Sequence, residues 1–237
     1  MTTAPVTLED QPLRLAVFDC DGTLLDGQHT VITAMRAAFQ PHGPDLPADE
    51  AVRAIIGLNL VEGIERLIGG RPGLDPLAIA EGYRAAYRTQ REVHGAVDPM
   101  YHGIADTLDA LEAAGVLLAV ATGKTRRGLD SALAAHGIAD RFVSLQTGDQ
   151  PPGKPHPAML ERALAETGVE AAQAVMIGDT TYDMLMARSA GVQAIGVAWG
   201  YHPVDALRQA GAQAIVANPV ELAAVALARL GVTEPAA

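Results

Sequence analysis

The chain has 237 residues, of which 49% are hydrophobic, enough for one large domain or for a core with a small second domain. Its formal net charge of −11 at pH 7 argues against a nucleic-acid partner, because nucleic acid requires a basic face. The single cysteine, Cys20, excludes an internal disulfide bond and fits a reducing compartment.

The first ten residues have neither the basic start nor the apolar stretch of a secretion signal. No apolar run reaches the ~18 residues that a membrane-spanning helix needs. We therefore expect a cytoplasmic protein with no membrane partner and with loose ends at 1–10 and 231–237.

The first predicted strand, 13–18, runs directly into Asp19 and Asp21. Two carboxylates at the end of a buried strand are costly unless a cation or a reaction uses them. Gly22 then allows a sharp turn, and Thr23 supplies a hydroxyl. This arrangement predicts a metal-assisted site at the edge of an α/β sheet.

Four helices are predicted next, in a stretch without a convincing strand. Their ranges are 31–39, 49–56, 60–68 and 77–92. An all-helical insertion of this length is too long for a loop in a compact domain. We expect a small helical cap domain at 29–97, inserted after the first strand, and a catalytic core made of 1–28 and 98–237.

Strands and amphipathic helices alternate over the rest of the chain. The predicted strands are 116–121, 142–145, 174–177, 194–197 and 214–216, and the predicted helices are 107–114, 125–136, 157–167, 182–190 and 204–210. A glycine follows each of these helices, where a C-cap favours a residue that tolerates positive φ. The alternation predicts an α/β fold with a Rossmann-like parallel sheet between two helical layers (αβα).

Residues that suit phosphate follow two of the later predicted strands. Thr122, Gly123 and Lys124 enter a helix, where a hydroxyl and backbone N–H groups form an anion site. Lys154 lies in a proline-bounded loop and can neutralise a phosphoryl group. Because strand carboxyl ends converge on one crevice of an open α/β sheet, these residues are expected to meet Asp19.

Two more carboxylates complete the set. Asp179 ends a predicted strand, and Asp183 faces the same side if the next helix begins near Thr180. Magnesium prefers oxygen ligands, and Asp19 and Asp179 can supply them. The cofactor predicted from the residues is therefore Mg²⁺.

Four motifs, in this order, resemble those of the haloacid dehalogenase-like superfamily of phosphotransferases and hydrolases. They are Asp19-Cys20-Asp21-Gly22-Thr23, Thr122, Lys154 and Gly178-Asp179-Thr180-Thr181-Tyr182-Asp183. The resemblance covers essentially the whole chain. A cap between the first and second motifs is similar to the subgroup of phosphoglycolate phosphatase, β-phosphoglucomutase and the haloacid dehalogenases.

The resemblance implies a role for each motif residue. Asp19 would attack phosphorus and form an aspartyl-phosphate. Asp21 would protonate the leaving alcohol and then deprotonate water. Thr122 and the Gly123 N–H would hold phosphoryl oxygens, and Lys154 would offset negative charge.

The resemblance also implies the metal ligands. Asp19, Asp179 and the backbone carbonyl of Asp21 would bind Mg²⁺, with Asp183 binding directly or supporting another ligand. Lys124 remains open between a contact to phosphate and a solvated position in the first turn of a helix. A nucleotide P-loop is disfavoured at Lys124, because that motif needs a glycine where Leu118 stands.

The implied function is a Mg²⁺-dependent phosphatase for a small phosphorylated metabolite, with phosphoglycolate favoured and the protein a monomer or homodimer. Asp21 argues against a dehalogenase, because halide leaves without an acid. The predicted cap has no lysine, which argues against phosphonate cleavage. A sugar phosphomutase remains open, although the uncharged Asn59 in the cap loop weakens it, and so does an inorganic pyrophosphatase. A phospho-Asp signalling receiver is disfavoured, because it needs neither the cap nor Asp21.

Other residues have ordinary structural interpretations. Cys20 is expected to point away from the carboxylates as a buried, inert thiol. Met184 and Met186 are expected to fill the core. The histidines show no paired spacing for a metal, and His202 is expected to lie at the surface or cap a helix.

Overall fold

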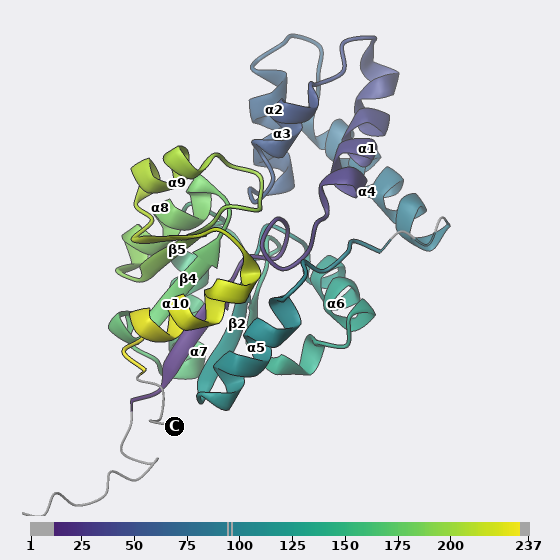
Figure 1. Cartoon of the computed structure of the whole chain (residues 1–237). Coiled ribbons are helices and arrows are strands. Elements are labelled where there is room, and N and C mark those ends of the chain that lie inside the picture. The colour runs from purple at the N-terminus through teal and green to yellow at the C-terminus, as the bar shows by residue number, and fades with distance from the viewer. Residues whose placement is uncertain (1–11, 94, 96, 233–237) are drawn as a thin grey trace, which may run out of the picture.

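The computed structural model describes residues 12–93, 95 and 97–232, and Figure 1 draws the whole chain. Its centre is a six-stranded sheet in which all paired strands are parallel, in the order β3-β2-β1-β4-β5-β6. The strands are β1 (Arg14–Phe18), β2 (Val116–Ala121), β3 (Phe142–Gln146), β4 (Ala174–Gly178), β5 (Gln193–Val197) and β6 (Ala214–Val216). The predicted parallel sheet is confirmed, and each predicted strand agrees with the structure to within a residue at either end.

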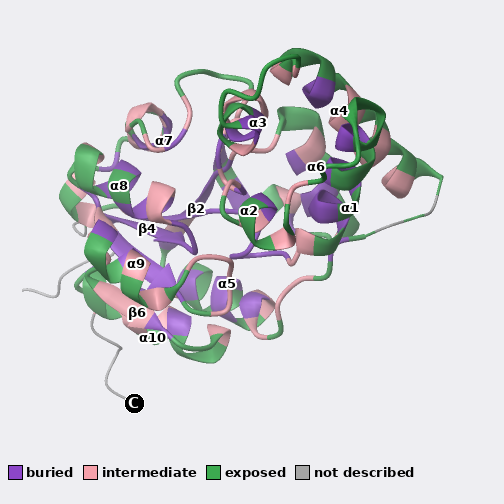
Figure 2. Cartoon of the chain, turned by 90° about the horizontal axis from the view of Figure 1, so that it is seen from above, coloured by how far each residue is buried: buried purple, intermediate pink, exposed green. Residues whose placement is uncertain are grey.

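Alternate residues of β1 point to opposite faces of the sheet, as the pleat requires. Ala16 and Phe18 join the hydrophobic cluster under α5 (Ile104–Ala113), α6 (Arg126–Ala135) and α10 (Leu222–Arg229). Leu15 and Val17 join the cluster under α7 (Ala158–Thr167), α8 (Thr181–Ala190) and α9 (Val204–Ala210). The predicted three layers are therefore present, and Figure 2 shows the strands almost entirely buried between helices with exposed outer sides.

Two helices of the core differ from the prediction. The first core helix, α5, begins at Ile104, three residues before the predicted start at Thr107, because Gly103 supplies a left-handed cap with φ of 93°. The last helix, α10, has no predicted counterpart. Its Ala-rich segment lacks a capping side chain, and it is stabilised by packing of Leu222 and Ala226 against the sheet cluster.

The segment between β1 and α5 folds as four helices, here called the inserted helices. They are α1 (Gln28–Phe39), α2 (Asp49–Arg53), α3 (Leu60–Ile68) and α4 (Pro76–Glu92). They share a hydrophobic cluster of their own, which includes Met35, Phe39, Ile64 and Ile79. Figure 1 shows them beyond the carboxyl ends of the strands. The predicted helix 49–56 is too long, because the helix ends at Arg53 and residues 54–57 form turns.

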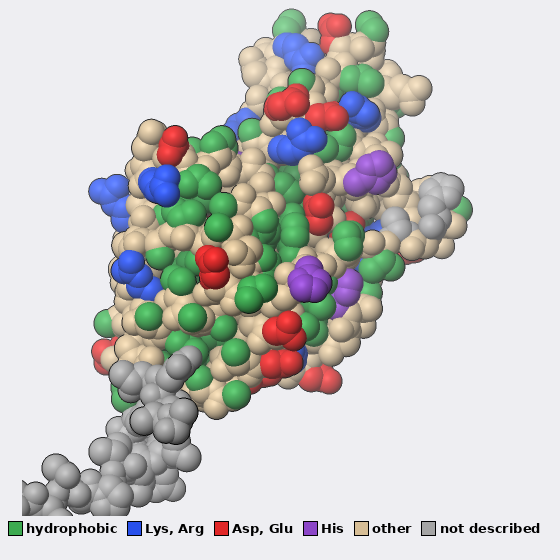
Figure 3. Space-filling view, in the orientation of Figure 1, with side chains coloured by type: hydrophobic (Ala, Val, Ile, Leu, Met, Phe, Trp, Pro, Cys, Tyr) green, Lys and Arg blue, Asp and Glu red, His purple; other side chains and the backbone are tan. Residues whose placement is uncertain are grey.

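The ends and the surface complete the description. Residues 1–11 and 233–237 lie outside the described part of the chain, so most of both predicted loose ends lies there as well. Val232 packs against the sheet cluster, so the prediction that the loose C-terminal end starts at residue 231 is wrong. Across the described helices, none combines the length and apolarity needed to cross a bilayer. Figure 3 shows acidic and basic side chains interspersed over one face of the molecule.

Candidate active site

The sharp turn after β1 places the Asp19 carboxylate and Gly22 against the end of β4. The Asp19 side chain is 1% exposed, and its backbone N–H donates to the Ile177 carbonyl of β4 at 2.9 Å. Gly22 has φ of 84°, and a Cβ there would lie 2.2 Å from Asp179 Oδ2. Only glycine therefore allows the turn to pass directly over the Asp179 carboxylate.

Asp179 is held at the end of β4 from two sides. Its Oδ1 accepts a hydrogen bond from Thr23 Oγ1 at 2.9 Å, and its Oδ2 accepts one from the Tyr201 N–H at 2.9 Å. On the other side Gly200 packs so closely that a Cβ would lie 2.1 Å from Asp179 Cβ. The loop after β5 and the turn after β1 thus fix this carboxylate.

Asp183 lies in the first turn of α8 and faces the same site, as predicted. Its Oδ2 accepts hydrogen bonds from the Thr180 N–H at 3.0 Å and the Thr180 hydroxyl at 2.6 Å. Thr180 in turn caps the helix by accepting from the Asp183 N–H, so the two residues form a capping box. Asp183 is fully buried, and its hydrogen bonds to Thr180 at the start of the helix fix the orientation of its carboxylate.

Lys154 connects these carboxylates. Its side chain is fully buried, and Nζ lies 2.9 Å from Asp19 Oδ1 and 2.6 Å from Asp183 Oδ1. Burial by itself would disfavour the ammonium, but the adjacent Asp183 and Asp19 carboxylates hold the pKa of Lys154 above its usual value. The lysine is therefore charged and bound to Asp19 and Asp183, and its pairing with Asp19 agrees with the role that the resemblance implies.

The site carries more negative charge than Lys154 balances. Burial raises the pKa of Asp19 to about 7, with Lys154 opposing this shift and Asp183 adding to it. Burial also raises the pKa of Asp179 well above its usual value, and the Asp19 and Asp183 charges add to that effect. A bound cation would remove this electrostatic cost and restore the ionised carboxylates.

The donor set fits a hard divalent cation. Asp19, Asp179 and Asp183 each offer a carboxylate oxygen, and these oxygens lie within 4.8 Å of one another. Asp19 Oδ1 is occupied by Lys154 and by the Cys20 N–H, whereas its buried Oδ2 accepts from no residue that the structure describes. The uncommitted Oδ2 of Asp19 is suited to nucleophilic attack.

The Asp21 side chain is not part of that carboxylate cluster. Its Oδ1 pairs with Lys124 Nζ at 2.9 Å, and both side chains are largely buried. Lys124 is thus not a solvated side chain, which was one of its two predicted positions. A contact between Lys124 and phosphate, and a metal contact of the Asp21 carbonyl, stay predictions.

Thr122 and Gly123 stand at the carboxyl end of β2, beside β1. The Thr122 side chain is buried, and its Oγ1 accepts from the Lys124 N–H at 3.3 Å. At Gly123 a Cβ would lie 2.5 Å from the Leu58 carbonyl and 2.8 Å from that of Gly57. Glycine therefore lets the loop after α2 approach the strand end.

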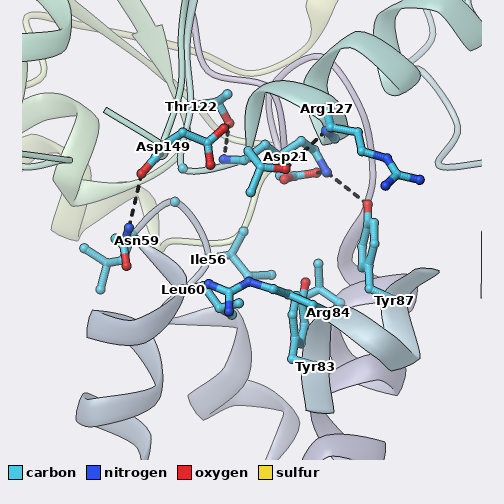
Figure 4. Close-up of a pocket in the computed structure, with 18 of the residues that line it drawn as sticks. Asp21, Ile56, Asn59, Leu60, Tyr83, Arg84, Tyr87, Thr122, Arg127 and Asp149 are labelled. Carbon is cyan, nitrogen blue, oxygen red and sulfur yellow. Dashed lines mark hydrogen bonds and ion pairs between the residues drawn. The ribbon is translucent and has the colours of Figure 1, made fainter. Parts of the chain in front are cut away.

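A cavity of about 500 Å³ lies between the strand ends and the inserted helices. Asp19, Asp21 and Thr122 line its floor. Figure 4 shows Ile56, Leu60 and Arg84 across from Asp21 and Thr122. Asn59 Nδ2 donates to the Gly148 carbonyl at 3.3 Å, which joins the loop before α3 to the core. The inserted helices thus form one wall of the site.

The residues given structural interpretations lie where the sequence predicts. Cys20 is buried in the cluster opposite Asp19, and burial raises the pKa of its thiol. Met184 and Met186 are buried in the core. His202 caps α8, since its Nδ1 accepts from the Thr181 N–H at 3.1 Å.

Several supporting residues carry no motif signal beyond a glycine or a hydroxyl. Gly200 and Tyr201 reach Asp179 from the loop after β5, and Tyr87 on α4 reaches Lys124. Their partners are far away in the sequence, so local patterns do not indicate them. The sequence indicates only that Thr23 supplies a hydroxyl. The hydrogen bond from this hydroxyl to Asp179 depends on the pairing of β1 with β4.

Comparison with known proteins agrees with this geometry. A probable phosphatase, IndB, of Dickeya dadantii is 36% identical over 91% of this chain and 94% of its own length. A phosphoglycolate phosphatase of Vibrio parahaemolyticus is 31% identical over 82% of this chain and 88% of its own. The crystal structure of a predicted phosphatase from Clostridium acetobutylicum matches with a TM-score of 0.80 and 23% identity, over 92% of this chain and 100% of that one, which shows the shared fold. Residues 16–197 match the model of the haloacid dehalogenase-like hydrolases, so the chain belongs to that family.

Proposed function

We propose that this hydrolase is a Mg²⁺-dependent phosphatase that cleaves a small phosphomonoester through an aspartyl-phosphate on Asp19. The observation that carries the proposal is the uncommitted Asp19 Oδ2, buried beside Lys154 and within a cluster of carboxylates. A nucleophile needs a free lone pair, which Asp19 Oδ2 has, and the Lys154 ammonium beside it can offset negative charge on the phosphoryl group.

The residues divide the reaction into two transfers. In the first, Asp19 Oδ2 forms a bond to phosphorus while the bond to the leaving oxygen breaks, and Asp21 gives that oxygen its proton. In the second, water forms a bond to phosphorus, Asp21 takes the water's proton, and Asp19 leaves as a carboxylate. Thr122, the Gly123 N–H and Lys154 stabilise the negative phosphoryl oxygens in both steps.

Asp19 and Asp179, supported by Asp183, would hold Mg²⁺. When bound there, the metal would supply positive charge that favours the ionised form of Asp19 and offsets charge on the phosphoryl group. The fit rests on the buried carboxylate oxygens and on the raised pKa values of Asp19 and Asp179. Removal of the metal with EDTA is expected to abolish phosphate release.

We further propose that residues 29–97 act as a cap domain over a core of 1–28 and 98–237. The inserted helices have their own hydrophobic cluster and close one side of the cavity above Asp19. Such a cap excludes bulk water from the phosphoryl group and selects the organic part of the substrate.

A small acid phosphate such as phosphoglycolate is the first substrate to test. Arg84, Arg88 and Arg91 of α4 line the cavity, and positive charge there suits a second anionic group. Arg84 pairs with Glu81 and Arg91 with Asp98, whereas Arg88 has no ion pair within the described part of the chain. The Vibrio relative named phosphoglycolate phosphatase supports the same choice.

The test compares phosphate release from 2-phosphoglycolate and ethyl phosphate, which differ by the carboxylate. We expect faster turnover of phosphoglycolate, no activity in Asp19→Asn, and a raised KM for phosphoglycolate alone in Arg88→Met. Equal rates for the two compounds would refute the assignment of an acidic substrate. Glucose 1-phosphate and pyrophosphate complete the panel, since production of glucose 6-phosphate would instead identify a mutase.

A further inference from the structure

Lys124 lies between the predicted acid/base residue and the inserted helices. Its Nζ is 2.9 Å from Asp21 Oδ1 and 3.2 Å from the hydroxyl of Tyr87 on α4. The same ammonium lies 5.5 Å from the centre of the Tyr87 ring. Figure 4 shows the contact to Tyr87 across the cavity. With these partners occupied, the ammonium is committed to the carboxylate and the tyrosine.

Tyr87 is itself held in a defined orientation. Its hydroxyl donates to Asp98 Oδ2 at 3.3 Å, so its lone pairs are free to accept from Lys124. Asp98 is 3% exposed, and it also accepts from Thr30 Oγ1 at 2.6 Å and from Arg91 Nη1 at 3.2 Å. The hydrogen bonds thus run in one direction, from Lys124 to Tyr87 and from Tyr87 to a fixed, buried carboxylate.

These contacts leave one oxygen of Asp21 for chemistry. Oδ1 lies against Lys124 and against Gly27, where an added Cβ would be 2.6 Å from that oxygen. Oδ2 accepts from no described residue. The carboxyl group is therefore oriented with Oδ1 fixed and Oδ2 available to exchange a proton.

We propose that Lys124 and Tyr87 are positioning residues, which orient the Asp21 carboxyl group for proton transfer to the leaving alcohol. This inference rests on the proposed phosphatase function. The proton moves from Asp21 Oδ2 to the leaving oxygen, and Lys124 keeps its own three protons throughout. Because Tyr87 belongs to α4, the orientation of the acid depends on how the inserted helices pack over the site.

The test exploits leaving groups that differ in their need for an acid. p-Nitrophenolate is a stable anion and leaves without a proton, whereas benzyl alkoxide requires one. The kcat/KM for p-nitrophenyl phosphate and for benzyl phosphate, two substrates of similar size, is measured in wild type, Tyr87→Phe and Lys124→Met. Tyr83→Phe is the matched control, because Tyr83 stacks on Tyr87 at 5.7 Å and has no hydrogen bond to Lys124.

We expect Tyr87→Phe to lower kcat/KM for benzyl phosphate by about 3- to 10-fold and Lys124→Met by about 30-fold, which is less than the 10²–10⁴ that loss of the general acid itself would cost. The kcat/KM for p-nitrophenyl phosphate should change less than about 2-fold in Tyr87→Phe, and in Lys124→Met it should fall less than the kcat/KM for benzyl phosphate, by the same reasoning. Tyr83→Phe should leave the ratio of the two substrates unchanged. If Lys124 and Tyr87 had a merely structural role, their replacement would lower kcat/KM equally for both substrates.

A double variant tests whether Tyr87 acts through Lys124. When Tyr87→Phe is added to Lys124→Met, kcat/KM for benzyl phosphate should not fall further, because the Lys124 ammonium that connects Tyr87 to Asp21 is already absent. A wild-type substrate ratio in Tyr87→Phe and Lys124→Met, or fully additive effects, would overturn the inference while leaving the phosphatase function intact. Wild-type protein that releases phosphate from no monoester would instead overturn the proposed function.

Discussion

Replacement of Gly123 by alanine offers a direct test of how the inserted helices approach the site. The new Cβ would lie 2.5 Å from the Leu58 carbonyl oxygen and 2.8 Å from that of Gly57. Both are backbone atoms, so the loop after α2 must retreat by roughly 1 Å to reach van der Waals distance. Overpacking of this kind costs about 1–3 kcal/mol.

The cost applies to the arrangement of this structure, in which the loop lies against Gly123. If catalysis requires this arrangement, kcat/KM should fall about 5- to 150-fold for every substrate, the factor that corresponds to 1–3 kcal/mol. The free energy of unfolding should change little, since the loop can move without disturbing the sheet. Steady-state kinetics with phosphoglycolate and ethyl phosphate, together with urea unfolding, measure the two effects separately.

Gly153→Ala is the matched control for Gly123→Ala. At Gly153 the nearest atom to a new Cβ is Asn59 Cβ at 3.9 Å, an ordinary contact. The reasoning would be refuted if Gly123→Ala kept the wild-type kcat/KM. It would also be refuted if Gly123→Ala lowered the free energy of unfolding by the full amount of about 1–3 kcal/mol, because the loop would then be unable to move away from the new methyl group.

Three further outcomes are expected. Dialysis against EDTA should remove phosphatase activity and added Mg²⁺ should restore it, whereas persistence of activity in the metal-free protein would contradict the role of Asp19 and Asp179 as ligands. Thr180→Ala should lower the free energy of unfolding in urea by about 1–2 kcal/mol, because the capping box of α8 is lost, and an unchanged value would mean that water replaces the hydroxyl. Leu58→Ala and Asn59→Ala should alter relative rates across a panel of phosphomonoesters more than they alter the dependence of rate on Mg²⁺ concentration, so identical relative rates would remove this loop from substrate selection.

The local sequence is sufficient to predict the strands and the residues that follow them. The apolar runs of β1, β2 and β4 are followed at once by Asp19, Thr122 and Asp179, and a parallel sheet brings such ends to one edge. Asp19, Thr122 and Asp179 could therefore be grouped from their positions alone. The inserted helices were recognisable because their 3.6-residue periodicity replaces the β/α alternation.

Contacts between distant segments determine the rest. The end of α2 at Arg53 and the stability of α10 depend on packing against other elements, which overrides weak local propensity. The same holds for Gly200, which lies against Asp179 only because β4 and β5 are neighbours. A glycine in a loop is compatible with many conformations, so the sequence does not indicate this contact.

Lys124 shows most clearly the difference between what the sequence determines and what the tertiary structure decides. The sequence by itself determined that a lysine follows Thr122 at the start of a helix near the phosphate site, and two positions for its side chain were compatible with that. Only the tertiary structure decided that the ammonium binds Asp21 and Tyr87. The physical reason is that a long, flexible side chain is oriented by the polar groups around it, and here these are the Asp21 carboxylate in the turn after β1 and the neutral Tyr87 hydroxyl on α4.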